Sequence, residues 1–77
     1  MSNQSEILKK IFISSLGLKK NINFSKLKYG DFNWDSVAHM KLIVQIEKKL
    51  NISIDVEDVV DMSSFKKALS IIDKYVD

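Results

Sequence analysis

The sequence predicts an all-α fold: a small four-helix bundle with three longer helices, a short third helix and a long loop between the first two helices. Three observations lead to this prediction. The chain of 77 residues contains no proline and only two glycines, so little in it interrupts a helix. Apolar residues recur at helical spacing in separate stretches. Residues that favour helix ends flank these stretches. At this length we expect one domain, residues 1–77.

The first helix is predicted from an apolar stripe near the N-terminus. Asn3 or Ser5 can cap its start, and Gly17 can end it, because glycine readily adopts the left-handed conformation that closes many helices. In residues 18–34, apolar and aromatic side chains are scattered among lysine and asparagine without a regular period. We expect a long loop there that packs its apolar side chains under the helices. The stripe of the first helix consists of Ile7, Leu8, Ile11, Phe12 and Leu16.

The second helix is predicted over Ser36–Leu50. Asp35 suits the N-cap position, where its carboxylate can accept a hydrogen bond from a backbone N–H of the first turn. Asn51 follows the last apolar residue and can end the helix. On a helical wheel this segment has two adjacent apolar stripes. Leu42, Ile43, Ile46 and Leu50 form the first stripe, and Val37, Met40 and Val44 form the second stripe.

The second stripe exceeds what the core of a small bundle needs. We therefore expect it to be exposed and to receive a partner, although burial of both stripes remains an alternative at this point. His39 lies among the residues of the first stripe, where we expect a partly buried packing residue. The predicted docking residues are Val37, Met40, Lys41, Val44, Glu47 and Lys48.

A short third helix is predicted over Val56–Val60, with Asp55 as its cap. The last helix begins after Ser63 or Ser64, either of which can cap it. Its apolar stripe consists of Phe65, Ala68, Leu69, Ile72, Tyr75 and Val76. The predicted shared core consists of Leu8, Phe12, Leu42, Ile46, Leu50, Ile54, Phe65, Leu69 and Ile72.

The composition argues against several classes of protein. Cysteine is absent, and a single histidine with acidic residues that lack calcium-loop spacing leaves no predicted metal site. No stretch approaches the roughly 18 apolar residues of a membrane span, and the N-terminus lacks the layout of a signal peptide. A net charge of +2 without any arginine argues against nucleic-acid binding. We expect a cytoplasmic monomer.

The most informative run extends from Asn33 to Val37. Ser36 falls in the first turn of the second helix, where unpaired N–H groups and the helix dipole favour a phosphate. His39 and Asp35 lie nearby, which superficially resembles a hydrolase triad. However, Asp35 is committed to the cap, and no nucleophile elbow or oxyanion hole accompanies the serine. Ser36 is therefore predicted to be modified, with no catalytic residue in the chain.

The sequence resembles the acyl carrier protein family over nearly its whole length. Asp35–Val37 is similar to the family's Asp-Ser-Leu attachment motif. Leu16–Leu18 resembles the Leu-Gly-Val that closes the family's first helix, and Met62–Phe65 resembles its Ile-Thr-Thr-Val entry into the last helix. Residues 42–54 resemble the family's apolar second helix, its Glu-rich end and the short link that follows.

The resemblance implies a carrier that bears 4′-phosphopantetheine on Ser36. A phosphopantetheinyl transferase would move this group from coenzyme A to the serine oxygen, and Asp35 and Val37 would complete the attachment motif. The thiol of the arm would then carry an acyl or aminoacyl group as a thioester between biosynthetic enzymes. An alternative with the same fold is a helical adaptor that binds partners through the second stripe and has no prosthetic group.

The departures from the family pattern lead to further expectations. Asn33 stands where the family has glycine, and we expect it to adopt a left-handed backbone there. Trp34 either shields the phosphate end of the arm or packs on the loop, and we favour packing. Carriers of fatty-acid synthesis present acidic residues along the second helix, where this chain has Lys41, Lys48 and Lys49. This difference indicates a stand-alone carrier of a specialised pathway.

Overall fold

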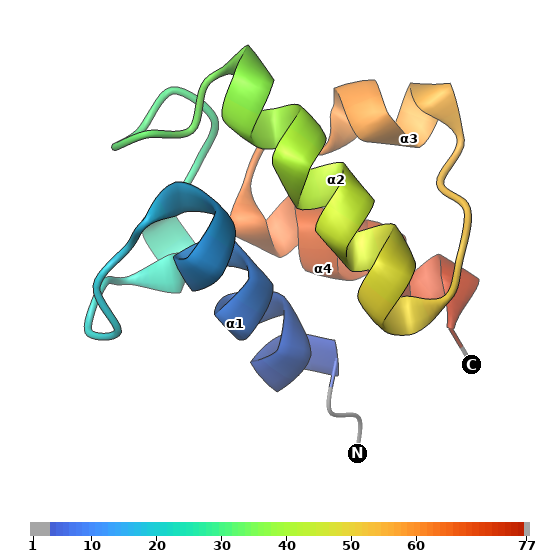
Figure 1. Ribbon diagram of the computed structural model, residues 1–77, viewed down its shortest axis with the longest axis horizontal. Helices are drawn as coiled ribbons and strands as arrows, with labels where there is room; N and C mark the ends of the chain where they lie inside the picture. The colour runs from blue at the N-terminus through green and yellow to red at the C-terminus, as the bar shows by residue number, and fades with distance from the viewer. Residues whose placement is uncertain (1–3, 77) are drawn as a thin grey trace.

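The computed structural model describes residues 4–76, which form four α-helices and one short 3-10 helix (Figure 1). An isolated antiparallel bridge joins Lys28 to Ser64, and the described residues contain no β-strand. The all-α prediction is confirmed. The elements are α1 (Gln4–Leu16), η1 (Phe24–Lys26), α2 (Ser36–Leu50), α3 (Val56–Asp61) and α4 (Phe65–Tyr75).

The ends of α2 lie where the sequence predicts them. The Asp35 carboxylate accepts a hydrogen bond from the backbone N–H of Ala38 at 2.9 Å. Asn51 ends the helix in the left-handed region, with φ 55°. Gly17 likewise ends α1 with φ 66°, as predicted. Side-chain capping and left-handed closure thus fix these boundaries locally, which is why the sequence reveals them.

The starts of α1, α3 and α4 follow the predicted caps only in part. Ser5 lies inside α1 and is not its cap, while Asn3 lies outside the described residues. Asp55 occupies the N-cap position of α3, as predicted, but its side chain makes no capping hydrogen bond. For α4 the cap is Ser64, whose hydroxyl accepts a hydrogen bond from the N–H of Lys67 at 3.0 Å.

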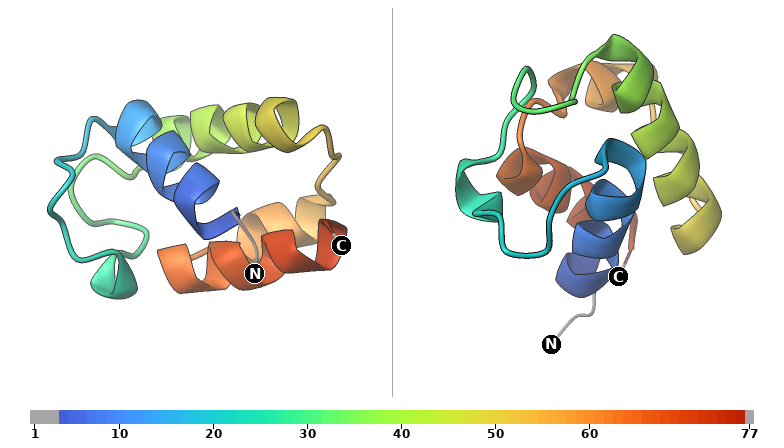
Figure 2. Two further views of the ribbon diagram at one scale, coloured as in Figure 1. Left: turned by 90° about the horizontal axis from the view of Figure 1, so that it is seen from below. Right: turned by 60° about the vertical axis from the view of Figure 1, so that its left-hand side comes forward.

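Helix α1 packs against both α2 and α4, and η1 packs against α4 (Figures 1 and 2). In Figure 1, α3 lies on the opposite side of the molecule from η1. The loop between α1 and α2 is anchored beneath the helices, since Leu27 is buried and Phe24 contacts Phe65 with ring centroids 4.8 Å apart. The expectation of a self-packed loop is confirmed for Leu27 and Trp34, whereas Tyr29 and Phe32 are exposed. The loop also contains η1, which the sequence does not indicate.

The buried core joins all of the long helices and the loop. Leu50 and Leu69, predicted for the core, are only partly buried, and the other predicted core residues are buried. The largest addition is Trp34, which is 1% exposed and makes an edge-to-face contact with Phe12 at 5.1 Å between centroids. The other buried residues absent from the predicted core are Ile11, Leu16, Leu27, Ala38, Ile43, Met62, Ala68 and Ile71.

Candidate functional site

Ser36 is the first residue of α2 and is exposed to solvent. Asp35 supplies two acceptors to the first turn: its side chain bonds Ala38 N–H, and its carbonyl accepts from His39 N–H at 2.8 Å. The N–H groups of Ser36 and Val37 have no hydrogen-bond partner among residues 4–76. Two free donors beside an accessible hydroxyl match the requirements of a phosphate ester at a helix N-terminus.

Several hydrogen bonds hold the segment that leads to Ser36. The Asn33 side-chain amide donates to the Leu16 carbonyl at 3.0 Å, which ties this segment to the end of α1. Trp34 N–H donates to the Asp31 carbonyl at 2.9 Å, and the Trp34 carbonyl accepts from Gly30 N–H at 3.0 Å.

The prediction of a left-handed Asn33 is wrong, because its neighbour takes that conformation. Phe32 has φ 51° and is 71% exposed. A bulky side chain seldom adopts this backbone region, and the turn therefore stores strain at Phe32. The Asn33 side chain instead tethers the loop to the end of α1, a contact that the sequence does not predict.

Trp34 lies in the core, in agreement with the packing interpretation, and it binds His39. The indole Nε1–H donates to Nδ1 of His39 at 2.9 Å. Because an indole N–H can only donate, Nδ1 carries no proton and Nε2 carries the ring hydrogen. Nε2 lies 2.8 Å from the carbonyl oxygen of Val59, to which it donates. This relay connects the loop, α2 and α3.

The relay leaves His39 no role as a base for Ser36. Both imidazole nitrogens are occupied, one by Trp34 and the other by Val59. The Asp35 carboxylate is occupied by the helix cap. Ser36, His39 and Asp35 are near one another in sequence, but they do not form a nucleophile–base–acid chain. This agrees with the prediction that they are not a hydrolase triad.

An apolar pocket of about 420 Å³ opens beside Ser36, between α2 and α3. This volume lies within the range of roughly 300–1,000 Å³ that small-molecule sites occupy. The sequence does not reveal the pocket, since Tyr29, Met62 and the α3 residues reach it only through the tertiary fold. Its lining consists of Tyr29, Ser36, His39, Met40, Val59, Val60, Met62 and Ser63.

The second stripe of α2 is exposed, as predicted: Val37 is 65% exposed, Met40 55% and Val44 44%. Lys41 and Lys48 are also exposed. Glu47, the remaining predicted docking residue, is half-buried and accepts a hydrogen bond from Ile54 N–H at 2.9 Å. Its carboxylate thereby holds the link between α2 and α3.

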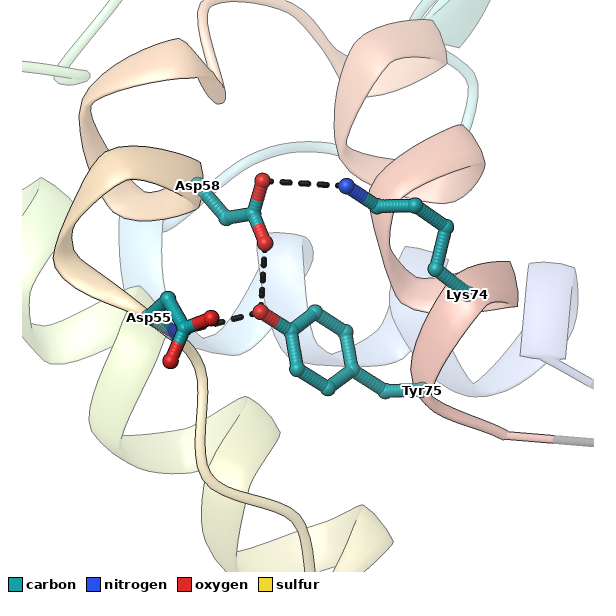
Figure 3. Close-up of polar contacts among 4 residues, drawn as sticks. All are labelled: Asp55, Asp58, Lys74 and Tyr75. Atoms are coloured by element: carbon teal, nitrogen blue, oxygen red, sulfur yellow. Dashed lines mark hydrogen bonds and ion pairs between the residues drawn. The ribbon is translucent and has the colours of Figure 1, made fainter.

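A second polar cluster joins α3 to the end of α4 (Figure 3). The Tyr75 hydroxyl donates to Asp58 and accepts from the Asp55 N–H at 3.1 Å, while Lys74 Nζ lies 3.1 Å from Asp58. Hydrogen bonds from Tyr75 and Lys74 lower the pKa of the Asp58 carboxyl below 3.8. The same contacts with Asp58 raise the pKa of Tyr75 above 10.0 and the pKa of Lys74 above 10.5.

Residues 4–76 hold no group of three histidine, cysteine or acidic side chains that could bind a metal ion. Among the same residues, no helix has both the length and the apolar character that crossing a membrane requires.

The chain is similar to the acyl carrier protein of Buchnera aphidicola subsp. Baizongia pistaciae (strain Bp). The two are 35% identical over 77 residues, which cover 99% of each chain. No protein-family model matches the chain, and no solved structure matches it at a significant level. This identity extends over nearly the whole of both chains, and the four-helix fold and the exposed serine fit the same family. Acyl carrier proteins act as carriers and not as enzymes. The chain therefore belongs to the acyl carrier protein family.

Proposed function

We propose that this carrier bears 4′-phosphopantetheine on Ser36 and moves acyl or aminoacyl groups between biosynthetic enzymes as thioesters. The observation that carries the proposal is the exposed hydroxyl at the start of α2, beside two unpaired backbone N–H groups. We further propose that residues 1–77 act as a single carrier domain, that the protein is a monomer, and that it works in the cytoplasm.

Attachment of phosphopantetheine to Ser36 would be a phosphoryl-transfer reaction. The serine oxygen forms a bond to the phosphorus that bears the pantetheine chain of coenzyme A, and the bond between the two phosphates breaks. Adenosine 3′,5′-bisphosphate leaves, and the hydroxyl proton goes to a base of the phosphopantetheinyl transferase. The chain contributes an accessible oxygen and a rigid helix start; the transferase supplies the catalysis.

Two features of the site fit the attached group. The N–H groups of Ser36 and Val37 face a position where a phosphate diester would carry negative charge, and the α2 dipole favours that charge. The apolar pocket beside Ser36 would accept the uncharged part of the arm or a short acyl chain. When bound, the group supplies the thiol that this chain lacks.

The test is intact-mass spectrometry after incubation with coenzyme A, magnesium and a promiscuous phosphopantetheinyl transferase. We expect the mass to rise by one phosphopantetheine group and the number of titratable thiols to rise from none to one. Ser36→Ala should abolish both changes, with its circular dichroism spectrum unchanged. Ser63→Ala is a matched control, because Ser63 is an exposed serine that lines the same pocket. Modification of Ser36→Ala would contradict the assignment.

We also propose that the carrier serves a specialised pathway and docks its enzymes through α2. The support is the exposed apolar stripe with Lys41 and Lys48 nearby, since a basic surface disfavours enzymes that recognise acidic carriers. The holo-protein should therefore be a poor acceptor for the malonyl transferase of fatty-acid synthesis, measured as kcat/KM with malonyl-coenzyme A. Efficient malonylation would remove the support for a specialised role.

A further inference from the structure

A groove runs along the seam between α1 and α2, which lie side by side in Figure 1. Two adjoining hollows, of about 620 and 380 Å³, form it and share Ser14 and Gln45 in their walls. The groove is separate from the pocket beside Ser36, with Met40 as the residue common to both. Its apolar lining consists of Ile7, Ile11, Val37, Met40 and Val44.

The charged groups that line this groove are all positive. Lys10 comes from α1, and Lys41 and Lys49 come from α2. Among residues 4–76, none of these three lysines forms an ion pair. No acidic residue lines either hollow, and the nearby Glu47 carboxylate is engaged with the Ile54 N–H instead. The groove therefore combines apolar contact surface with three uncompensated positive charges on both of its walls.

We propose that the α1–α2 groove binds an acidic amphipathic helix of a partner protein. Val37, Met40 and Val44 follow one another at spacings of three and four residues, the pattern into which apolar anchors of a partner helix interlock. Carboxylates beside those anchors would pair with the lysines. From Val37 to Lys49 the groove follows α2 for about 18 Å, which matches about three turns of a partner helix.

The charge pattern favours an acidic protein segment over a nucleic acid. A phosphate backbone would use the lysines but would leave the apolar lining without a counterpart, and the chain has no arginine for bidentate phosphate contacts. An amphipathic acidic helix satisfies both parts of the surface. The inference deepens the proposed docking of partners on α2, but the binding itself does not require modification of Ser36.

The test is a nuclear magnetic resonance titration of the full-length, unmodified chain labelled with ¹⁵N. The probes are designed amphipathic helical peptides with leucines at i, i+3, i+4 and i+7, prepared in several registers. One set has flanking glutamates, and a matched set has lysines at the same positions. We expect the glutamate peptides to shift the amides of the groove residues and to bind more weakly as salt rises, because exposed charge pairs are screened. The lysine peptides should not bind.

Charge reversal localises the effect. Lys10→Glu and Lys41→Glu should each weaken binding of the glutamate peptide roughly three- to tenfold, the range expected for loss of one exposed ion pair plus a new repulsion. Lys19→Glu and Lys20→Glu make the same change in net charge at exposed positions outside the groove and should leave the affinity unchanged. Circular dichroism spectra of all variants should match that of the wild type.

Equal binding of lysine and glutamate peptides would overturn the proposal. Equal weakening by the control variants, or chemical-shift changes confined to residues outside the groove, would do the same. Binding of a single-stranded oligonucleotide in preference to every glutamate peptide would likewise reject it. Attachment of phosphopantetheine to Ser36 is measured separately, by intact-mass spectrometry. Failure of peptide binding with successful loading would thus refute the groove proposal and leave the carrier function standing.

Discussion

Replacing His39 with leucine should destabilise the fold substantially, because two hydrogen bonds of the imidazole are lost. In His39→Leu, the Nε1–H of Trp34, a residue that is 1% exposed, loses its acceptor, and the Val59 carbonyl loses a donor. A buried unsatisfied donor costs about 1–3 kcal/mol, and a lost neutral hydrogen bond costs about 0.5–1.5 kcal/mol. The free energy of unfolding should therefore fall by roughly 2–4 kcal/mol, a large fraction of the stability of a domain this size.

A double-mutant cycle isolates the contribution of the indole hydrogen bond. Trp34→Phe removes the donor, so His39→Leu no longer leaves an unpaired N–H in that background. We expect the second substitution to cost about 1–2 kcal/mol less there than in the wild type. Urea unfolding followed by far-ultraviolet circular dichroism measures all four proteins without relying on tryptophan emission.

Gln45→Leu is the control for this cycle, since it makes a similar polar-to-apolar change at an exposed position of α2. Its effect should stay within about 0.5 kcal/mol. If the effects of Trp34→Phe and His39→Leu add to within about 0.5 kcal/mol, the two rings are not coupled. The inferred Nε2–H tautomer and the connection from the loop to α3 would then be wrong.

Other predictions concern caps, strain and pH. Asp35→Ala should lower the free energy of unfolding in urea by about 0.5–2 kcal/mol, because α2 loses its cap. Phe32→Asn should raise it by up to about 1 kcal/mol, because asparagine accepts a left-handed backbone more readily; a drop in stability would show that the exposed ring makes a contact of its own. The stabilisation from the Asp58–Tyr75 contact should be present above pH 3.8 and lost as the pH falls through the lowered pKa of Asp58. It should also be lost as the pH rises through the raised pKa of Tyr75, above 10.0. The difference in melting temperature between wild type and Tyr75→Phe, followed across pH, should therefore shrink at both extremes.

The sequence predicts helix α2 best, because its signals are local. A capping carboxylate, an apolar period and a left-handed asparagine act over a few residues, and each is visible in the sequence. The exposure of the second stripe also follows from counting how much apolar surface so small a core can use. The serine at the helix start is recognisable from its neighbours alone, although its accessibility is a property of the fold.

The remaining features depend on contacts between distant segments. Packing of Trp34 is predictable from the sequence, but its two flanking partners, Phe12 and His39, are not, because the tertiary fold brings them together. The Asp55 side chain suits an N-cap but makes no capping hydrogen bond. Its backbone N–H instead donates to the Tyr75 hydroxyl at the end of α4, a contact between distant segments. Phe32 takes the strained backbone that local preference would assign to Asn33, because the Asn33 amide is bound to the end of α1.

Helix α3 has no buried residue and is fastened through the histidine relay on one side and the Tyr75 cluster on the other. Detachment of α3 would expose little apolar surface. The free energy of this local opening should therefore be far below the free energy of global unfolding. We therefore expect the wall that α3 forms beside Ser36 to open while the other three helices stay assembled. In hydrogen-exchange experiments the amide hydrogens of α3 should exchange for deuterium much faster than those of α1, α2 and α4.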